Sequence, residues 1–358
     1  MLGTYTPAQL RAFLADQGKR TTSNYQLIEL VQDTNIPNLF FLREVYGPHG
    51  LISSETWRHY HFPRASPDIV LSSYHEGNNT MLLVAEGRTE LKLVKAQRPI
   101  GIESLVVHRD EAEIIYAGYA GGGVSASIGR GLAEGVNRIQ VIQEGGGEKL
   151  GKGALWVPVR KHLIFAVDDT DNHETGATYD LVGREVREAL EDSLDIRATY
   201  IAECNLHGVV EKTSNCFATA VGVTYDGREQ TKEAIKRKVL EVLREKAMSD
   251  YGCVVFFDGF IIPQRVEEYG VKAKNERIES LDYVIDLAGQ HQLAWHHVGK
   301  GTQKGKERGL KGALAALGLF WKLKYCAAPP GEPVPDDAKF YPDYYTSNQV
   351  IQGYAKKI

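Results

Sequence analysis

The sequence predicts a two-domain protein of mixed α/β (α+β) class, with a β-rich α+β domain first and an α/β domain second. Three observations lead to this prediction. The chain has 358 residues, enough for two domains with separate cores. Its hydrophobic content of 43% and charged content of 25% are those of an ordinary globular protein. Short β-type runs dominate the first half, whereas strand-type and helix-type segments alternate in the second half.

The N-terminal domain is expected to span residues 1–160. Residues 7–45 are predicted to be largely helical, with a start signal at Thr6-Pro7. From about 50 to 115 the pattern changes to β-type runs separated by glycine, asparagine and proline. The predicted segments of this domain are β-runs at 67–72, 80–85, 90–94 and 113–117, a loop entering a helix at 121–133, and β-runs at 138–142 and 154–159.

The C-terminal domain is expected to span residues 161–325, followed by a tail at 326–358 that is rich in proline and tyrosine. Apolar residues at helical spacing alternate here with short apolar runs. The predicted strands are 163–167, 198–202, 216–223 and 253–257, and the predicted helices are 178–193, 229–247 and 312–325. This alternation indicates an α/β domain.

Composition excludes several classes of protein. The net charge of −4 provides no global positive field for nucleic acid, so any such site has to be a local patch. The sequence has no run of eighteen apolar residues, and its start lacks the regions of a signal peptide. The four cysteines show no CxxC spacing, which argues against a zinc ribbon. Together these features predict a cytoplasmic protein without membrane contacts.

The most informative segment is an apolar strand that runs into the carboxylates of Asp168, Asp169 and Asp171. Carboxylates this close repel one another unless a cation lies between them, and hard oxygen ligands suit Mg²⁺ bridging to phosphates. The simpler alternative is an acidic turn with Asp171 or Thr178 as the N-cap of the next helix.

A second segment, residues 296–316, is rich in glycine and lysine and leads into an alanine-rich helix. Backbone N–H groups and the positive end of the helix dipole would face a ligand at this junction, which suits a polyphosphate. The spacing is not that of a Walker A motif. The alternative is a charged loop followed by a helix that packs through small residues.

Other candidate segments are less specific. The polar turn at Lys212, Thr213 and Asn215 could present its side chains to a ligand or could be an ordinary turn. Glycine runs at 121–123 and 145–147 could hold a second anion or could form hairpin turns. Four histidines invite a metal interpretation, although most such residues are simply surface or core residues: His207, His291, His296 and His297.

Three of these segments, in this order, resemble the kinase-like domain of archaeal tRNA-isoleucine agmatidine synthetase. They are Asp168–Asp171 with Gly176 and Thr178, the turn at 212–215, and the segment 308–318. That family carries a similar DDTD sequence, a KTRGN-like turn and a GRGLIGALAAIG-like segment. The resemblance covers roughly residues 162–325. The whole chain is also similar to the methanogenesis marker protein 11 family, including the glycine runs that precede DDTD.

The resemblance implies ATP-dependent transfer with ATP and Mg²⁺ as cofactors. Asp168, Asp169 and Asp171 would hold Mg²⁺, and Thr178 matches a threonine that becomes phosphorylated. Asp168, Asp169 and Thr178 would thus be the catalytic residues. The nucleotide-binding residues implied by the resemblance are Thr170, Gly176, Lys212, Thr213, Asn215, Arg308, Gly309, Leu310 and Gly312.

Two departures from the synthetase pattern bear on the acceptor. Ser214 stands where the family has an arginine, and the sequence after residue 325 lacks zinc-ribbon cysteines and the length for an OB-fold. These departures argue against tRNA, so the acceptor stays unidentified. The preferred hypothesis is a Mg-ATP-dependent phosphoryl or nucleotidyl transferase associated with methanogenesis. The alternatives are an RNA-modifying enzyme and a non-catalytic nucleotide-binding scaffold.

Overall fold

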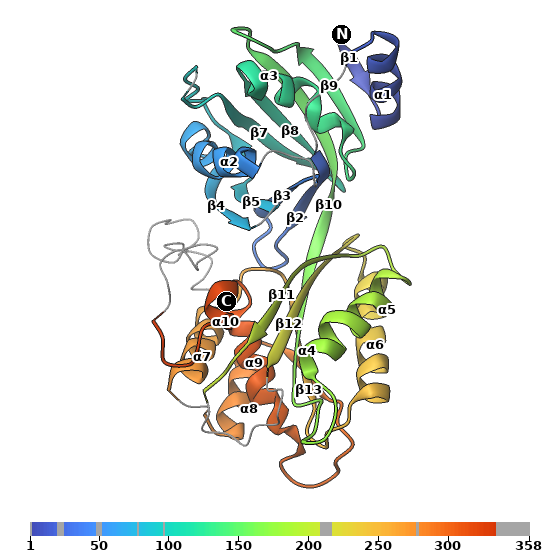
Figure 1. The fold of residues 1–358 in the computed structure, drawn as a ribbon, viewed down its shortest axis with the longest axis vertical. Helices are drawn as coiled ribbons and strands as arrows, with labels where there is room; N and C mark the ends of the chain where they lie inside the picture. Colours follow the sequence, from blue (N-terminus) through green and yellow to red (C-terminus); the bar gives the residue numbers. More distant parts are fainter. Residues whose placement is uncertain are drawn as a thin grey trace. The chain divides into compact units, whose positions relative to one another are not determined.

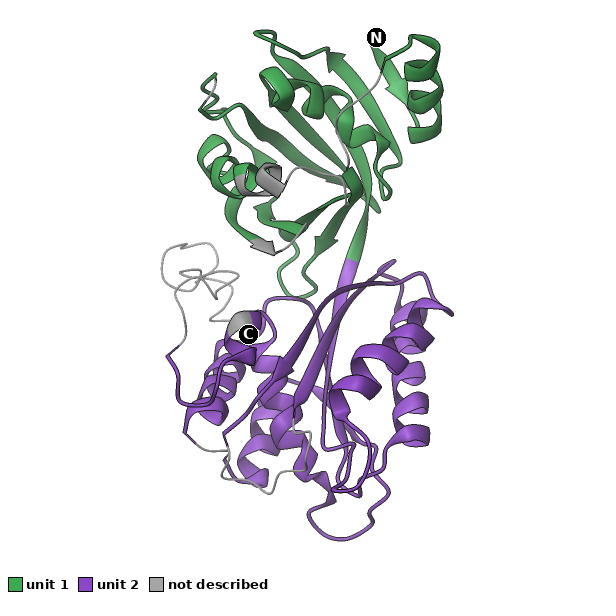
Figure 2. Cartoon of the chain, viewed as in Figure 1, with its two compact units in different colours: residues 1–160 green, residues 161–358 purple. Residues whose placement is uncertain are grey.

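The computed structural model describes residues 2–19, 25–47, 52–76, 79–95, 97–207, 217–276 and 279–333. The chain divides into two compact units, Met1–Arg160 (unit 1) and Lys161–Ile358 (unit 2) (Figure 2). Each unit combines a β-sheet with helices (Figure 1). The predicted two-domain mixed α/β fold is therefore confirmed.

Unit 1 is built on an antiparallel sheet with the strand order β4-β5-β3-β2-β10-β8-β7-β6, and β9 pairs with both β10 and β1. Its elements are β1 (Gly3–Tyr5), α1 (Pro7–Asp16), β2 (Tyr25–Gln32), β3 (Leu39–Tyr46), α2 (Ile52–Ala65), β4 (Val70–Glu76), β5 (Asn79–Ala85), β6 (Gly87–Arg88), β7 (Ile100–His108), β8 (Glu111–Gly118), α3 (Ala120–Ser127), η1 (Gly129–Leu132), β9 (Arg138–Gln143) and the first part of β10 (Gly151–Asp168).

Helix α1 begins where the sequence predicts. Thr6 forms a capping box with Gln9, and Pro7 occupies the first turn. The prediction of helix up to residue 45 is wrong, because β2 and β3 occupy most of that range. In β2, Ile28, Glu29 and Val31 are all buried. A strand buried on both faces loses the alternation that distinguishes it from a buried helix.

Three further predictions for unit 1 are wrong. Residues 52–65 form α2 rather than β-type runs, and 90–94 lies in no strand apart from a single bridge between Val94 and Arg98. The segment 121–133, predicted as a loop that enters a helix, is already helical at its start, in α3. A Cβ atom at Gly123 would lie 2.6 Å from the carbonyl oxygen of Gly118. These glycines therefore let α3 pack closely on β8.

Strand β10 continues from unit 1 into unit 2 without a break. The sequence suggests two runs, 154–159 and 163–167, but one strand covers Gly151–Asp168. Its first part pairs with β8 and β9, and its last part pairs with β12 and β13. Asp168 is its final residue.

Unit 2 has an antiparallel sheet with the strand order β11-β12-β10-β13-β14. Its further elements are α4 (Thr178–Asp180), η2 (Leu181–Val186), α5 (Arg187–Glu191), β11 (Arg197–Cys204), β12 (Ala218–Tyr225), α6 (Glu229–Lys246), β13 (Cys253–Asp258), α7 (Gln264–Asn275), α8 (Leu281–Gln290), β14 (Ala294–His297), η3 (Lys306–Gly309), α9 (Leu310–Leu319) and α10 (Leu323–Ala327).

Helices cover both faces of this sheet (Figure 1). Leu163, Phe165 and Val167 of β10 pack with apolar residues of η2 and α6. The opposite face of β10 carries Ile164, which pairs with Gly222 beside the ring of Phe320 at the end of α9. Because side chains alternate along a strand, Asp168 lies on the face that α9 covers.

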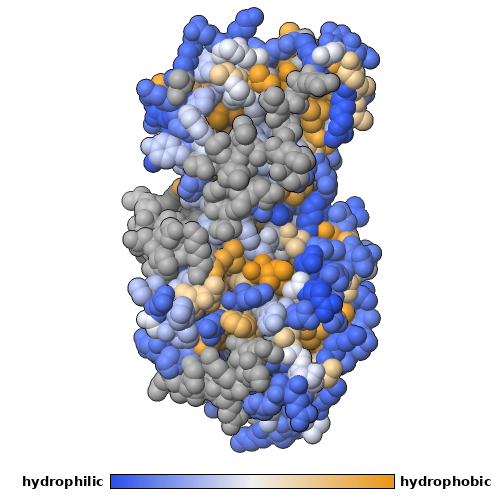
Figure 3. Space-filling view, viewed as in Figure 1, coloured by the Kyte–Doolittle hydropathy of each residue, from blue (hydrophilic) through white to orange (hydrophobic). Residues whose placement is uncertain are grey.

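The predicted strands and the helix over 229–247 of this unit are confirmed to within a few residues, whereas the predicted helix 312–325 is two helices, α9 and α10. Helices α7 and α8 and strand β14 were not expected. Most of the predicted tail at 326–358 lies outside the described residues. Within the described part, the helices are too short or too polar to span a membrane. On the face shown in Figure 3, hydrophilic atoms predominate and the hydrophobic areas are scattered.

Candidate functional site

The two segments singled out by the sequence meet at the end of β10. One is the acidic strand end, Asp168–Asp171, and the other is the junction of η3 with α9. A Cβ atom at Gly312, in the first turn of α9, would lie only 1.8 Å from Oδ2 of Asp168. Glycine is thus required there because the Asp168 carboxylate presses against the N-terminal turn of the helix.

The partly buried Asp168 lies in an environment that disfavours its charge. Burial, followed by the negative charge of Asp169 and then of Asp171, raises the pKa of Asp168 well above its ordinary value. The charge of Arg308 acts in the opposite direction but does not offset these effects. A bound cation would favour the ionised form.

Asp169 has a strained backbone and an arginine partner. Its φ of +63° lies in the left-handed region, which aspartate tolerates better than most residues. Nε of Arg308 donates to Oδ2 of Asp169 at 3.0 Å. The guanidinium of Arg308 also lies 3.6 Å from the centre of the Tyr251 ring. These contacts hold the carboxylate and the guanidinium in one orientation.

Thr178 is held in a buried hydrogen-bond cluster. Its hydroxyl donates to Oδ1 of Asp171 at 3.1 Å and accepts from the backbone N–H of Thr170 at 3.2 Å. Thr170, Asp171 and Thr178 are all buried. Residue Ala177 is the N-cap of α4 and provides no side-chain cap, so the N-cap alternative for Asp171 or Thr178 is wrong. Asp171 orients the threonine hydroxyl instead.

Three further residues of the predicted site, Gly176, Gly309 and Leu310, shape its backbone or pack in the core and offer no polar side chain to a ligand. Gly176, with φ of +91°, turns the chain between Asp171 and α4. Gly309 lies close to backbone, since a Cβ there would be 2.5 Å from the carbonyl oxygen of Tyr251. The Leu310 side chain is buried, so this residue offers only its backbone at the start of α9.

The polar turn that completes the predicted site lies outside the described residues. This applies to Lys212, Thr213 and Asn215. The structure thus brings together the acidic strand end and the start of α9, and the placement of the third segment stays a prediction.

The segment 248–252, which follows α6, also supports the site. The carbonyl of Thr170 accepts from the backbone N–H groups of Met248 and Ser249, at 2.7 and 3.2 Å. Tyr251 supplies the ring beneath Arg308. This segment could not be predicted as part of the site, because a short polar turn after a helix gives no signal of its distant partners.

The alternative metal sites find no support. Among the described residues, Asp168, Asp169 and Asp171 included, no three His, Cys, Asp or Glu side chains form a ready-made metal-binding group. His296 and His297 are neighbours on β14, and Nε2 of His297 lies 2.8 Å from the carbonyl oxygen of Asp250. This contact gives His297 a structural partner.

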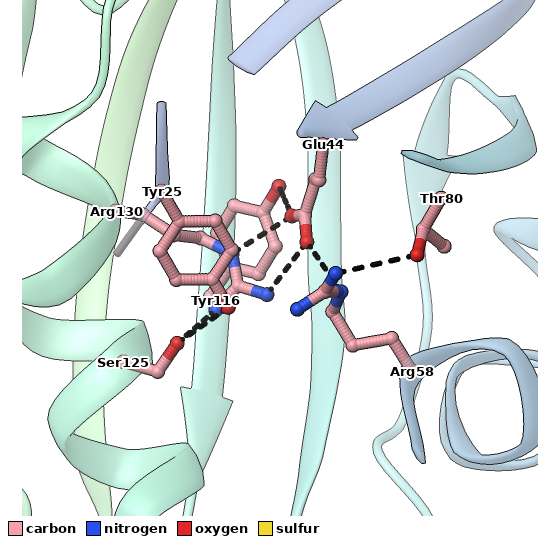
Figure 4. A network of polar contacts seen from close by, with 7 residues as sticks. All are labelled: Tyr25, Glu44, Arg58, Thr80, Tyr116, Ser125 and Arg130. Atoms are coloured by element: carbon pink, nitrogen blue, oxygen red, sulfur yellow. Dashed lines mark hydrogen bonds and ion pairs between the residues drawn. The ribbon is translucent and has the colours of Figure 1, made fainter. Parts of the chain in front are cut away.

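Arg130, which follows the glycine run at 121–123, belongs to a buried polar network in unit 1 (Figure 4). Nε and Nη2 of Arg130 donate to the two carboxylate oxygens of Glu44, at 2.8 and 3.0 Å. Nη1 of Arg130 donates to Ser125, and Tyr116 also donates to Glu44. Arg58 makes an ion pair of 3.2 Å with Glu44. Arg130 is therefore occupied by protein groups.

Comparisons with solved structures find partial similarity to TiaS, an agmatidine synthetase that acts on an isoleucine tRNA. The complex of TiaS with this tRNA and ATP is 24% identical, with a TM-score of 0.37, over 44% of this chain and 36% of that chain. Apo TiaS is 23% identical, with a TM-score of 0.35, over 44% and 35%. A tRNA fluorescent labeling enzyme gives 24% and 0.37. The match thus spans about a third of the length of each structure.

No protein-family model matches the chain. A curated relative is the uncharacterized protein MJ0921 of Methanocaldococcus jannaschii. It is 30% identical over 282 residues, which are 78% of this chain and 89% of the relative. The similarity extends over both units. The chain therefore belongs to the same protein family as MJ0921.

Proposed function

We propose that unit 2 binds ATP with Mg²⁺ at the end of β10 and transfers a phosphoryl or nucleotidyl group to an acceptor. The observation that supports this most is the contact of the Asp168 carboxylate with the first turn of α9. Gathered carboxylates attract a divalent cation, and a helix N-terminus attracts phosphate. The two features lie side by side, as a metal-bound polyphosphate requires.

The carboxylates fit Mg²⁺ in the manner usual for nucleotide enzymes. Mg²⁺ is commonly held by one or two carboxylates and by substrate phosphates, not by a complete protein cage. Asp168 and Asp169 would hold the ion, whose charge would offset the repulsion that Asp169 exerts on Asp168. When bound, Mg²⁺ neutralises charge on the phosphates. Asp171 accepts a hydrogen bond from Thr178, so it would act on the reaction through the threonine hydroxyl.

The protein residues have separate roles in this proposal. Arg308 would stabilise phosphate charge while Asp169 and Tyr251 hold its orientation. Thr178 would be the first acceptor, since its hydroxyl already donates to Asp171. As Oγ1 attacks the γ-phosphorus, Asp171 takes the proton, the bond to the bridging oxygen breaks, and ADP leaves.

Isosteric variants test this proposal. We expect D168N and D169N each to weaken ATP binding at least tenfold in the presence of Mg²⁺, measured by calorimetry. The control is D286N, because Asp286 is an exposed carboxylate on α8. If both site variants bind and hydrolyse ATP like wild type, unit 2 does not use this site for Mg-ATP.

RNA is a second candidate acceptor, because a lysine-rich loop adjoins the site. Lys300 and Lys304 are exposed, and the backbone of Lys300 is tied to Ser249 beside the acidic strand end. Electrostatic RNA binding weakens steeply with salt. We expect K300E/K304E to abolish binding of a tRNA transcript at low salt. Equal binding by wild type and this variant would exclude the loop as an RNA site.

The resemblance to methanogenesis marker protein 11 extends the proposal to methanogen physiology, with an enzyme or cofactor as the final acceptor. Affinity purification from native cells, followed by mass spectrometry of bound protein and RNA, distinguishes these acceptors. Recovery of RNA alone would favour the RNA alternative. ATP binding without hydrolysis, even with each recovered partner present, would favour the scaffold alternative.

A further inference from the structure

Helix α2 of unit 1 has two different faces. Arg58, Phe62 and Ala65 are buried against the sheet. A second set at positions i, i+3, i+4 and i+7 forms one stripe along the helix. We call it the α2 stripe: Trp57, Tyr60, His61 and Arg64.

The two largest residues of the α2 stripe are exposed, and each contacts another residue of the stripe. Trp57 is 48% exposed and Tyr60 is 53% exposed. The Trp57 ring stacks on His61 at 4.5 Å, with an angle of 28° between the planes. The guanidinium of Arg64 lies 3.7 Å from the centre of the Tyr60 ring and donates to the Tyr60 carbonyl. Side chains already held in place lose less entropy when a partner binds.

His61 adds a buried polar group beneath this surface. It is only 9% exposed, and its Nδ1 has no hydrogen-bond partner within the described residues. Burial, the charge of Arg64 and the charge of Arg98 lower its pKa, so the ring is neutral near pH 7. An unpaired buried ring nitrogen is costly, and a docked partner that supplies a hydrogen bond would remove this cost.

The charge around the α2 stripe is positive. Lys92 lies beside the end of α2, because its backbone N–H donates a hydrogen bond to the carbonyl of Ala65. The charged groups that act on His61 are Arg64 and Arg98, which are both positive. The partner that complements this surface therefore carries negative charge.

We propose that the α2 stripe docks an acidic segment of another protein, with apolar side chains on Trp57 and Tyr60 and carboxylates on Arg64 and Arg98. Tryptophan, tyrosine and arginine dominate the energetics of protein–protein interfaces. A polynucleotide fits less well, since the chain has a net charge of −4 and gives a long polyanion no overall attraction. A short acidic segment needs only local complementarity.

A display experiment on the full chain tests the proposal without a known partner. Random twelve-residue peptides are selected on the immobilised protein, and the affinities of the enriched peptides are measured by fluorescence anisotropy. We expect enriched peptides to combine Asp or Glu with large apolar residues. Their affinity should fall at least tenfold in W57A/Y60A and in R64E. The matched control is Y283A, because Tyr283 is a 40% exposed tyrosine on α8.

Two outcomes would overturn this inference. One is that no enriched peptide depends on the α2 stripe, while thermal melts show that W57A/Y60A and R64E are folded. The other is that a mixed-sequence 20-nucleotide single-stranded RNA binds wild type and is lost in W57A/Y60A. The latter result would assign the α2 stripe to nucleic acid. Neither outcome depends on the ATP site of unit 2.

Discussion

Each unit contains a carboxylate that is shielded from water, but the surroundings of the two are opposite. In unit 1, Glu44 is fully buried and faces the guanidinium groups of Arg130 and Arg58 (Figure 4). Burial alone would raise its pKa, yet the two arginines and the Tyr116 hydroxyl hold the pKa of Glu44 below its ordinary value. This carboxylate is stabilised by the protein itself.

In unit 2, Asp168 faces like charge. Burial and the neighbouring Asp169 raise its pKa, and Arg308 is engaged with Asp169. The comparison teaches how to separate a structural carboxylate from a binding one. A charge that the fold compensates contributes to stability, whereas one that the fold compensates only in part is a candidate for ligand binding.

The largest expected effect comes from neutralising Glu44. In E44Q, two buried arginines lose their carboxylate partner, and the free energy of unfolding should fall by about 3–5 kcal/mol. Urea denaturation followed by circular dichroism measures this change. The control is D180N, which removes an exposed ion pair with Arg184 and should leave stability unchanged. An E44Q protein as stable as wild type would show that the arginines do not need this carboxylate.

The ion pairs of Glu44 also predict how the stability of the protein changes at acid pH. The folded-state pKa of Glu44 is depressed, so its stabilisation is complete above the unfolded value of about 4.3. It is lost as the pH falls through the lower folded value. We therefore expect the stability gap between wild type and E44Q to shrink below about pH 4. Parallel melts of the two proteins over this range check the result, and a constant gap would contradict it.

An intermediate effect is expected at Gly312. A methyl group there would collide with Asp168, so G312A should destabilise unit 2 by about 1–3 kcal/mol and weaken Mg-ATP binding. Gly289 in α8 is the matched control, because no atom lies within 4 Å of its Cβ position. There, alanine should stabilise the helix by about 0.5–1 kcal/mol. If the two substitutions change stability equally, then Asp168 does not contact the first turn of α9, and the proposed site loses its main support.

The sequence indicates the carboxylates of the proposed site better than the structural ones. Asp168, Asp169 and Asp171 are adjacent in the chain, so their mutual repulsion is visible in the residues alone. The start of α9 can also be predicted from a short stretch of sequence, because glycines and lysines lead directly into small apolar residues. That the acidic strand end and the start of α9 lie together in space was expected only from the family resemblance, in which both segments occur in the same order.

The Glu44 cluster could not be predicted, because its members come from distant parts of the chain. Glu44, Arg58 and Arg130 lie on β3, α2 and η1. In the sequence each looks like an ordinary charged surface residue, and 7–45 was expected to be helical. Tyr251 was missed for the same reason, since its partner Arg308 lies far along the chain.

The smallest expected effect has the opposite sign and is the sharpest test of the comparison. Because ionised Asp168 is disfavoured in the folded state, D168N should raise the stability of ligand-free protein at pH 7. Melts in EDTA measure this gain. With Mg-ATP added, wild type should gain about 2.7 kcal/mol at a hundredfold excess over Kd, and D168N much less. If D168N instead destabilises the ligand-free protein as E44Q does, then Asp168 is a structural carboxylate like Glu44.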